Sequence, residues 1–337
     1  MKKLLLFAII LAVVVPITIT GQQKVPAKIF SRVGIQVKFG QLQDFFKLGL
    51  PVDECERIYK KDHIYFKVPL TQYDIELLKK SPYPYKIEIE NVEEFYSSRY
   101  TAKSLQKAEE YRKNIGTEMK LGSMGGFYTV EEIEENLDYL FKKYGTKKKL
   151  ITKKKSIGKS HEGRKIYMVK ISDNAHKDEE NEPQVLYTGL IHAREPAGMM
   201  SIFYFMYYLL ENYETDNRVR SIVDNHEIYI IPLVNVDGYA YNQKTRPNGG
   251  GMQRKNRNGN GIDLNRNFGP HELWDYPNGG SSTSSWSQTY RGTAAFSEKE
   301  TQALWNFIQS KKFKAALNYH TYSNLLLYPW GHKNKIA

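Results

Sequence analysis

The chain has 337 residues, of which 41% are hydrophobic and 26% are charged, so it can hold one large globular domain and a smaller one. Its single cysteine, Cys55, excludes a fold held together by internal disulfides. The formal net charge is +12, but the basic residues occur in short, scattered runs such as 147–149 and 153–155. Such runs are typical of solvated faces and helix C-termini, so we expect no nucleic-acid partner.

The N-terminus has the pattern of a signal peptide. Two lysines precede the apolar run 4–19, and small residues follow it near a plausible cleavage point. An uncleaved membrane anchor is the alternative, but Pro16 interrupts the run. We therefore expect residues 1–22 to be a signal peptide, the protein to be secreted or periplasmic, and no stable membrane anchor to remain.

Residues 28–100 show the alternation of a small α+β domain. Strand-like patterns near 30–37, 63–68 and 85–89 are separated by helical spacing, and Thr71 is a candidate N-cap. This domain is either a pro-segment or accessory domain that covers or chaperones the next domain, or a structural appendage. A charged helical pattern begins near its end and runs into a glycine-rich stretch, which predicts a connector and linker over residues 101–126.

Residues 127–337 predict a second, α/β domain. Dense apolar runs at 184–191 and 226–235 indicate buried strands, with a long apolar helix over 197–213 between them. Strands that alternate with helices favour a mixed, mostly parallel sheet with helices on both faces.

Two helix starts and a last strand complete this prediction. Thr129 with Glu132, and Ser297 with Glu300, have the spacing of capping boxes. A further buried strand is expected over residues 315–318.

Several polar residues follow the predicted strands directly. His192, Asn235, Asp237 and His320 all stand at strand ends, and ligands bind such sheets beyond the carboxyl ends of the strands. His192 and Glu195 are three residues apart, so a tight turn would let both reach one metal ion. Two imidazoles and a carboxylate form the ligand set of a catalytic zinc site with an open fourth position. Taken alone, the pair could equally be a surface coincidence, but its place after a buried strand favours a metal site.

A second polar cluster lies between residues 254 and 268. The guanidinium of an arginine matches a carboxylate, and a neighbouring asparagine amide can complete the clamp. Asp263 can accept the second N–H of a metal-bound histidine and fix its orientation.

The chain resembles the zinc metallocarboxypeptidases, namely the pancreatic-type carboxypeptidases and their secreted bacterial relatives. The resemblance covers roughly residues 127–331 and rests on ordered motifs: His192-Ala193-Arg194-Glu195, Asn235-Val236-Asp237-Gly238-Tyr239, Arg254-Lys255-Asn256-Arg257, Asp263-Leu264-Asn265-Arg266-Asn267-Phe268, Tyr290-Arg291-Gly292, Ala295-Phe296-Ser297-Glu298 and His320-Thr321-Tyr322-Ser323.

This resemblance implies roles for the motif residues. It implies that His192, Glu195 and His320 bind one Zn²⁺ per chain. It also implies that the substrate is the C-terminus of a peptide or protein and that other motif residues bind it. We expect the protein to be a monomer. Arg254 would polarise the scissile carbonyl, Asn265 and Arg266 would hold the terminal carboxylate, Arg194 and Tyr322 would line the peptide cleft, and Asp263 would support a zinc histidine.

The family's general base is a glutamate on a strand well beyond the third zinc ligand, with a substrate-capping tyrosine before it. Residues 321–337 contain no aspartate or glutamate. We therefore expect the sequence to be a C-terminally truncated piece of a longer product, inactive or incomplete as it stands, because losing a general base typically costs about 10²–10⁴-fold in rate.

The leading hypothesis is thus a secreted zinc carboxypeptidase precursor. One alternative is a non-catalytic, zinc-dependent peptide-binding protein that keeps the carboxylate clamp. Another is a zinc amidohydrolase that acts on cell-wall peptides. The clamp residues favour a substrate with a free terminal α-carboxylate.

Overall fold

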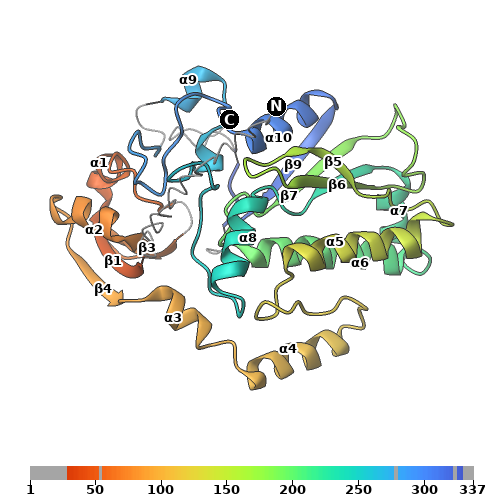
Figure 1. Ribbon diagram of the computed structural model, residues 1–337, viewed down its shortest axis with the longest axis horizontal. Helices are drawn as coiled ribbons and strands as arrows, with labels where there is room; N and C mark the ends of the chain where they lie inside the picture. Colours follow the sequence, from red (N-terminus) through yellow and green to blue (C-terminus); the bar gives the residue numbers. More distant parts are fainter. Residues whose placement is uncertain (1–28, 53–54, 277–279, 322–324, 329–337) are drawn as a thin grey trace, which may run out of the picture.

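The computed structural model describes residues 29–52, 55–276, 280–321 and 325–328, and it contains two sheets (Figure 1). The predicted signal peptide, residues 1–22, lies outside the described residues. In the described part of the chain, every helix is too short or too polar to cross a membrane.

The first sheet is antiparallel and has the strand order β2 (Glu56–Tyr59), β3 (His63–Thr71), β1 (Phe30–Lys38) and β4 (Tyr85–Ile89). A short 3-10 turn, η1 (Phe39–Gln41), precedes α1 (Leu42–Phe46), and α2 (Gln72–Lys79) follows β3. Apolar side chains of β1 and β3 pack with both helices into one core. This is the predicted small α+β pattern. The sequence did not indicate β2, because its four residues are only partly buried and lack apolar alternation.

Thr71 is the N-cap of α2, as predicted, and its side chain accepts a hydrogen bond from the backbone N–H of Asp74. The charged connector forms two helices, α3 (Val92–Ser97) and α4 (Ala102–Asn114), because Thr101 caps a new helix start. After α4, residues 122–127 fold back on themselves through two isolated bridges. Gly122 is required there, since a Cβ atom would lie 2.0 Å from the carbonyl oxygen of Phe127.

The second sheet is mixed and has the strand order β5 (Lys155–Lys159), β6 (Lys165–Ile171), β8 (Glu227–Ile231), β7 (Gln184–Gly189) and β9 (Phe313–Tyr319). The neighbours β8, β7 and β9 run parallel, whereas β5, β6 and β8 pair antiparallel. The predicted mixed α/β fold is therefore confirmed, and the parallel half of the sheet carries the residues predicted to bind metal.

Helices cover both faces of this sheet. On one face, Tyr187 of β7 packs against Phe205 of α6 (Pro196–Asn212), with ring centroids 5.0 Å apart. On the other, Tyr229 of β8 packs against Phe307 of α10 (Lys299–Gln309), with centroids 5.8 Å apart. The remaining described helices are α5 (Val130–Leu140), η2 (Phe141–Gly145), α7 (Asn217–Asp224), α8 (Val236–Thr245), η3 (Leu264–Arg266) and α9 (His271–Trp274). Thr129 and Glu132 form the predicted capping box at α5.

Two sequence predictions about this domain are wrong. Helix α10 begins after Glu298, so Ser297 does not cap it; the Ser297 hydroxyl donates to the Glu298 carboxylate instead. Residues 314–318 of β9 are exposed rather than buried; within the described chain β9 is an edge strand that pairs only with β7.

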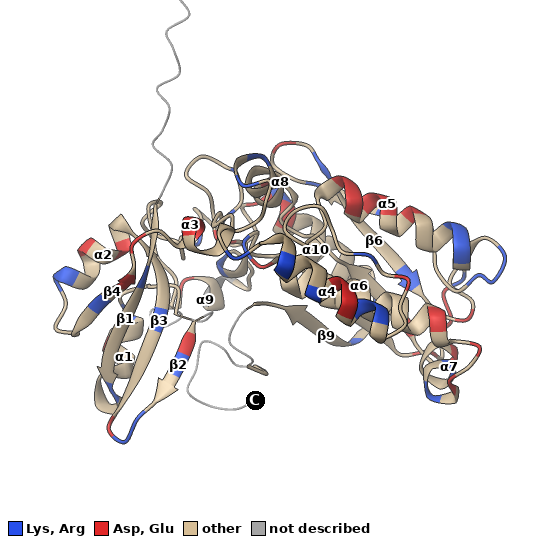
Figure 2. Ribbon diagram, turned by 90° about the horizontal axis from the view of Figure 1, so that it is seen from below, with Lys and Arg blue, Asp and Glu red and all other residues tan. Residues whose placement is uncertain are grey.

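Basic and acidic residues alternate along the helices and loops of the chain without gathering in one region (Figure 2). Several form ion pairs, as Lys154 does with Glu134 at 3.0 Å and with Asp138 at 2.9 Å. The net positive charge is thus distributed among local pairs and scattered lysines.

Candidate metal centre

The metal centre is built on the turn that follows β7. Leu190 adopts a left-handed backbone conformation with φ 51°, which is costly for a branched side chain and redirects the chain at the strand end. The backbone N–H of Glu195 then donates to the carbonyl of His192 at 3.2 Å, and Pro196 opens α6. This turn places the His192 and Glu195 side chains on the same side, as the sequence predicted.

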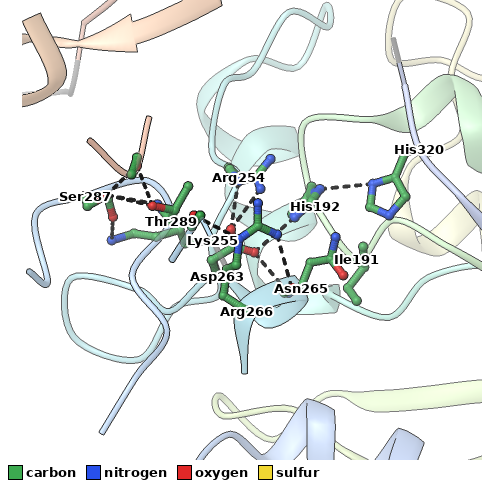
Figure 3. A network of polar contacts seen from close by, with 12 residues as sticks. Ile191, His192, Arg254, Lys255, Asp263, Asn265, Arg266, Ser287, Thr289 and His320 are labelled. Carbon is green, nitrogen blue, oxygen red and sulfur yellow. Dashed lines mark hydrogen bonds and ion pairs between the residues drawn. The ribbon is translucent and has the colours of Figure 1, made fainter. Parts of the chain in front are cut away.

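His320 comes to the same point from the end of β9 (Figure 3). His192 Nδ1 lies 2.9 Å from Glu195 Oε1 and 3.1 Å from His320 Nδ1. His320 Nδ1 lies 2.9 Å from Glu195 Oε2, which also accepts the N–H of Thr321. His192 and Glu195 are buried, whereas the His320 side chain is 26% exposed.

Asp263 fixes the protonation of His192. Its Oδ1 lies 3.0 Å from His192 Nε2, and its Oδ2 accepts hydrogen bonds from Arg254 Nε and Nη2 at 3.2 and 2.8 Å. Burial alone would raise the pKa of Asp263, but the charge of Arg254 and the hydrogen bond from His192 hold that pKa well below its usual range. Asp263 is therefore a carboxylate that can only accept, so His192 Nε2 carries the proton and Nδ1 presents a lone pair.

The lone pair of His192 Nδ1 points at another imidazole nitrogen and at a carboxylate oxygen. Three such electron-rich groups repel one another unless a cation lies between them. Zinc bonds of about 2.0–2.1 Å in tetrahedral geometry place donor atoms about 3.3 Å apart. The observed separations of 2.9 to 3.1 Å are close to that value, so these three residues fit a zinc ion.

A buried asparagine holds this turn beside the segment that contains Arg254. Asn235, at the start of α8, donates to the carbonyl oxygens of Ile191 and Arg254 at 3.3 and 3.1 Å. Asp237, also at a predicted strand end, faces elsewhere and accepts from Ser160 Oγ at 2.7 Å. Of the four strand-end residues, His192 and His320 thus meet as potential ligands, and Asn235 supports them.

Asn265 and Arg266 lie next to the centre in η3, which Asp263 caps at its N-terminus (Figure 3). The backbone N–H of Asn265 donates to Asp263 Oδ1 at 3.0 Å. The Arg266 guanidinium donates to the carbonyls of Gly280 and Asn265 at 3.3 and 3.2 Å. The segment 263–266 therefore joins the buried Asp263 to the two residues predicted to bind a carboxylate.

A cavity of about 320 Å³ lies beside the metal centre. Ala193, Arg194 and Thr321, which adjoin the three metal-ligand candidates, line one side of it. Tyr96 of α3 and Tyr100, in the turn between α3 and α4, line another side. Arg194 lines this cavity, and its place along a peptide cleft stays a prediction; Tyr322 lies outside the described residues.

The N-terminal unit (residues 30–97, β1 to α3) packs against this region at several points. The carbonyl oxygen of Gly49 accepts a hydrogen bond from Thr289 Oγ1 at 2.6 Å. Glu93 of α3 accepts from Arg246 Nη2 at 2.5 Å and from the backbone N–H of Met252 at 3.2 Å. The Arg194 guanidinium lies 6.0 Å from the centroid of the Phe30 ring.

Sequence reasoning missed several buried polar residues around the site. Lys255 is almost fully buried, and its ammonium donates to the carbonyls of Ser285 and Ser287, both at 2.8 Å. Asn256 and Asn267 are fully buried as well. Their positions within polar motifs were the available signal, but burial of a polar residue cannot be read from a polar stretch of sequence.

Comparison with known proteins gives one family. The family described as "Zinc carboxypeptidase" matches residues 137–336. Carboxypeptidase O of Bos taurus is 35% identical over 185 residues, 53% of this chain and 47% of the relative. The zinc carboxypeptidase of Simulium vittatum is 36% identical over 183 residues, 52% of this chain and 55% of the relative. The chain thus spans about half the length of the curated relatives it matches.

Solved structures agree. The crystal structure of carboxypeptidase A from Helicoverpa armigera is 25% identical and has a TM-score of 0.65, covering 88% of this chain and 70% of that one. Bovine thrombin-activatable fibrinolysis inhibitor, solved in complex with tick carboxypeptidase inhibitor, is 28% identical with a TM-score of 0.53, covering 63% and 66%. The family match over residues 137–336 covers most of the second domain and confirms the resemblance that the sequence motifs indicated. The chain belongs to the zinc carboxypeptidase family.

Proposed function

We propose that this protein is a zinc-dependent metallocarboxypeptidase that removes C-terminal residues from peptides and proteins. The observation that carries the proposal is the convergence of His192 Nδ1, His320 Nδ1 and the Glu195 carboxylate within 3.1 Å of one another. One zinc ion held there would polarise the scissile carbonyl and lower the pKa of a bound water.

The neighbouring residues prepare the centre for this ion. Asp263 keeps the proton of His192 on Nε2, which leaves Nδ1 free to bind metal and fixes the plane of the ring. The hydrogen bond from the Thr321 N–H orients the Glu195 carboxylate. Arg254, fixed by Asp263, would stabilise the negative charge that develops on the carbonyl oxygen of the substrate.

Asn265 and Arg266 would hold the α-carboxylate of the last substrate residue, because a guanidinium and an amide side by side match its two oxygens. The residues upstream of the cut bond would pass along Arg194 and Tyr322. The cavity beside Arg194 and Thr321 provides room for them next to the metal centre. A free terminal carboxylate is therefore the feature by which substrates would be selected.

Neither acidic residue of the described metal centre is available as the general base. Within the described chain, the acidic residues at the centre are Glu195, a candidate metal ligand, and Asp263, which is bound to His192 and Arg254. Both are committed to other roles, so neither is proposed to take the proton of the attacking water.

We propose further that the N-terminal unit is a pro-segment or accessory domain. Its Gly49, Phe30 and Glu93 contact the loops around the metal centre, which supports a role in covering the cleft. The basic and apolar N-terminal pattern supports export through a signal peptide over residues 1–22. We propose one zinc ion per chain and a monomer.

The proposal is tested by measuring hydrolysis and binding of N-acylated dipeptides, with a free and with an amidated C-terminus, by the zinc-loaded protein. We expect the free-carboxylate peptide to be bound preferentially and, where the protein supplies a general base, to be the one that is cut. Arg266→Ala should weaken its binding about 10–100-fold, the usual range for a charged hydrogen bond, and leave the amide nearly unaffected. Arg218→Ala, at a side chain that is 89% exposed, is the control. Equal losses for both peptides would remove Arg266 from the clamp.

A further inference from the structure

The segment 254–267 contains the three residues proposed to bind the scissile carbonyl and the terminal carboxylate of the substrate: Arg254, Asn265 and Arg266. Two fully buried asparagines lie near its ends, Asn256 and Asn267. Both are bound to the N-terminal end of α10, which contributes no metal ligand candidate. Binding of a metal ion does not require these contacts between the two asparagines and the start of α10.

Asn256 closes the first half of the segment into a fixed loop. Its Nδ2 donates to Glu298 Oε2 at 2.7 Å, and its Oδ1 accepts the N–H of Ile262 at 2.8 Å. Its backbone N–H donates to the carbonyl of Ile262 at 3.0 Å. The two bonds to Ile262 hold the chain after Arg254 beside the chain before Asp263, and the Glu298 carboxylate holds the Asn256 amide that makes one of them.

Asn267 anchors the other end, directly after Arg266. Its Oδ1 accepts hydrogen bonds from Thr301 Oγ1 at 2.7 Å and from the backbone N–H of Glu298 at 3.2 Å. Its Nδ2 donates to the carbonyls of Arg291 and Ala294 at 2.9 and 3.0 Å. Both polar atoms of the Asn267 side chain are therefore hydrogen-bonded, and all of their partners lie within residues 291–301.

The turn that leads into α10 adds a strained residue to the same junction. Phe296 has φ 57°, a left-handed conformation that a bulky side chain rarely adopts. Its N–H donates to the carbonyl of Asn267 at 2.6 Å, and its ring stacks on Trp305 with centroids 5.1 Å apart. Strain of this kind persists where the surroundings over-determine the backbone, and it collects at functional sites.

We propose that Asn256 and Asn267 are positioning residues that set the place of Arg254, Asn265 and Arg266 from the N-terminus of α10. This rests on the proposed function, in which those three residues read the end of the peptide. Thr301 and Glu298 then influence recognition of a C-terminal carboxylate without touching the substrate or the metal.

Thr301→Val gives the mildest test, because it keeps the side-chain shape and removes the hydroxyl that donates to Asn267. Thr301→Ser keeps that hydroxyl and is the conservative variant. Asn267→Asp replaces the two donors with an acceptor at equal size. Thr152→Val is the matched control, since Thr152 is a buried threonine in the same domain whose hydroxyl accepts the backbone N–H of Lys170.

The readout is a binding ratio, measured with the zinc-loaded full chain by ligand-observed NMR. The probes are an N-acetyl amino acid and its primary amide. We expect the wild type to prefer the carboxylate at least about 10-fold, as one charged hydrogen bond provides. Thr301→Val and Asn267→Asp should reduce this preference at least threefold, with zinc content unchanged, while Thr301→Ser and Thr152→Val retain it.

A purely structural role would lower the melting temperature of Thr301→Val and Thr152→Val alike and leave the preference intact in both, which would overturn the inference. A wild type without any preference would overturn it as well. Failure of the proposed function is a separate result: it would be seen as absent peptide hydrolysis, whatever the binding ratio shows.

Discussion

Asp263 connects the metal centre to the residues that would read the substrate. One of its oxygens binds His192, and the other binds the buried Arg254. The backbone N–H groups of Asn265 and Arg266, in η3, also donate to Asp263. A single carboxylate thereby fixes the tautomer of a metal ligand candidate and the orientation of a guanidinium.

Asp263→Asn should therefore affect metal binding and stability together. We expect zinc affinity to fall about 10–100-fold, the usual effect of removing a partner of a metal-bound histidine. The free energy of unfolding should fall by about 3–5 kcal/mol, because Arg254 would lose its buried carboxylate partner. Chelator competition and urea unfolding measure the two effects. The control is Asp224→Asn on α7, which removes a carboxylate outside the metal centre and should change the zinc affinity and the free energy of unfolding less. An unchanged zinc affinity in Asp263→Asn would refute the role given to Asp263.

At the scale of single residues, the sequence indicated the candidate metal ligands but not the buried side chains that hold the neighbouring segment in place. His192, Glu195 and Asp263 were found because strand ends and short motifs are local patterns. The places of Asn256 and Asn267 depend on contacts with residues far along the chain: Asn256 binds Glu298, 42 residues away, and Asn267 binds Thr301, 34 residues away. No local pattern encodes such a contact, so both were recognised only as parts of a motif.

At the scale of elements, the long apolar helix, the capped start of α5 and the strands β7 and β8 followed from periodicity and capping signals. The start of α10 did not, because the Ser297 hydroxyl is bound to Glu298 instead of to the helix. The burial of β9 was also predicted wrongly. Its apolar residues indicated a strand correctly, but burial depends on which elements cover the strand, and that is a tertiary property.

The loop between β6 and β7 allows a pH test. Burial, followed by the charges of Glu179, Asp173 and Glu227, raises the pKa of Glu182 to about 7. A carboxyl whose pKa is higher in the folded state destabilises that state as the pH rises from about 4.5 through 7. Glu182→Gln should thus increase the free energy of unfolding by about 1–2 kcal/mol at pH 8, after allowance for solvent screening, and by almost nothing at pH 4.

Urea unfolding at the two pH values measures this effect, with Glu180→Gln at an exposed neighbouring position as the control. An equal gain at pH 4 and pH 8 would show that Glu182 is ionised in the folded state with an ordinary pKa.

At the scale of the whole molecule, the N-terminal unit lies beside the second domain (Figure 1) and contacts it through Gly49 with Thr289 and Glu93 with Arg246. The sequence indicated both units and the glycine-rich turn between them. It could not indicate how they pack, since Glu93 and Arg246 are 153 residues apart in the chain.

Glu93→Gln should loosen this packing. The variant keeps the size of the side chain and removes the charge that binds Arg246 and the Met252 N–H. We expect faster hydrogen exchange at the Met252 amide and, if the N-terminal unit covers the cleft as proposed, faster hydrolysis of added peptides. Glu90→Gln, on the exposed surface of the same unit, is the control. Unchanged exchange at Met252 would show that Glu93 does not hold the two units together.

The central claim is that His192, Glu195 and His320 form a zinc site, and the most direct test is the metal content of the purified chain. After loading and dialysis, elemental analysis should find about one zinc ion per chain in the wild type. His192→Ala and His320→Ala should each abolish stoichiometric binding, whereas His226→Ala, whose imidazole contacts the Ile222 carbonyl, should retain it. Zinc retained at the wild-type level in both site variants would contradict the account.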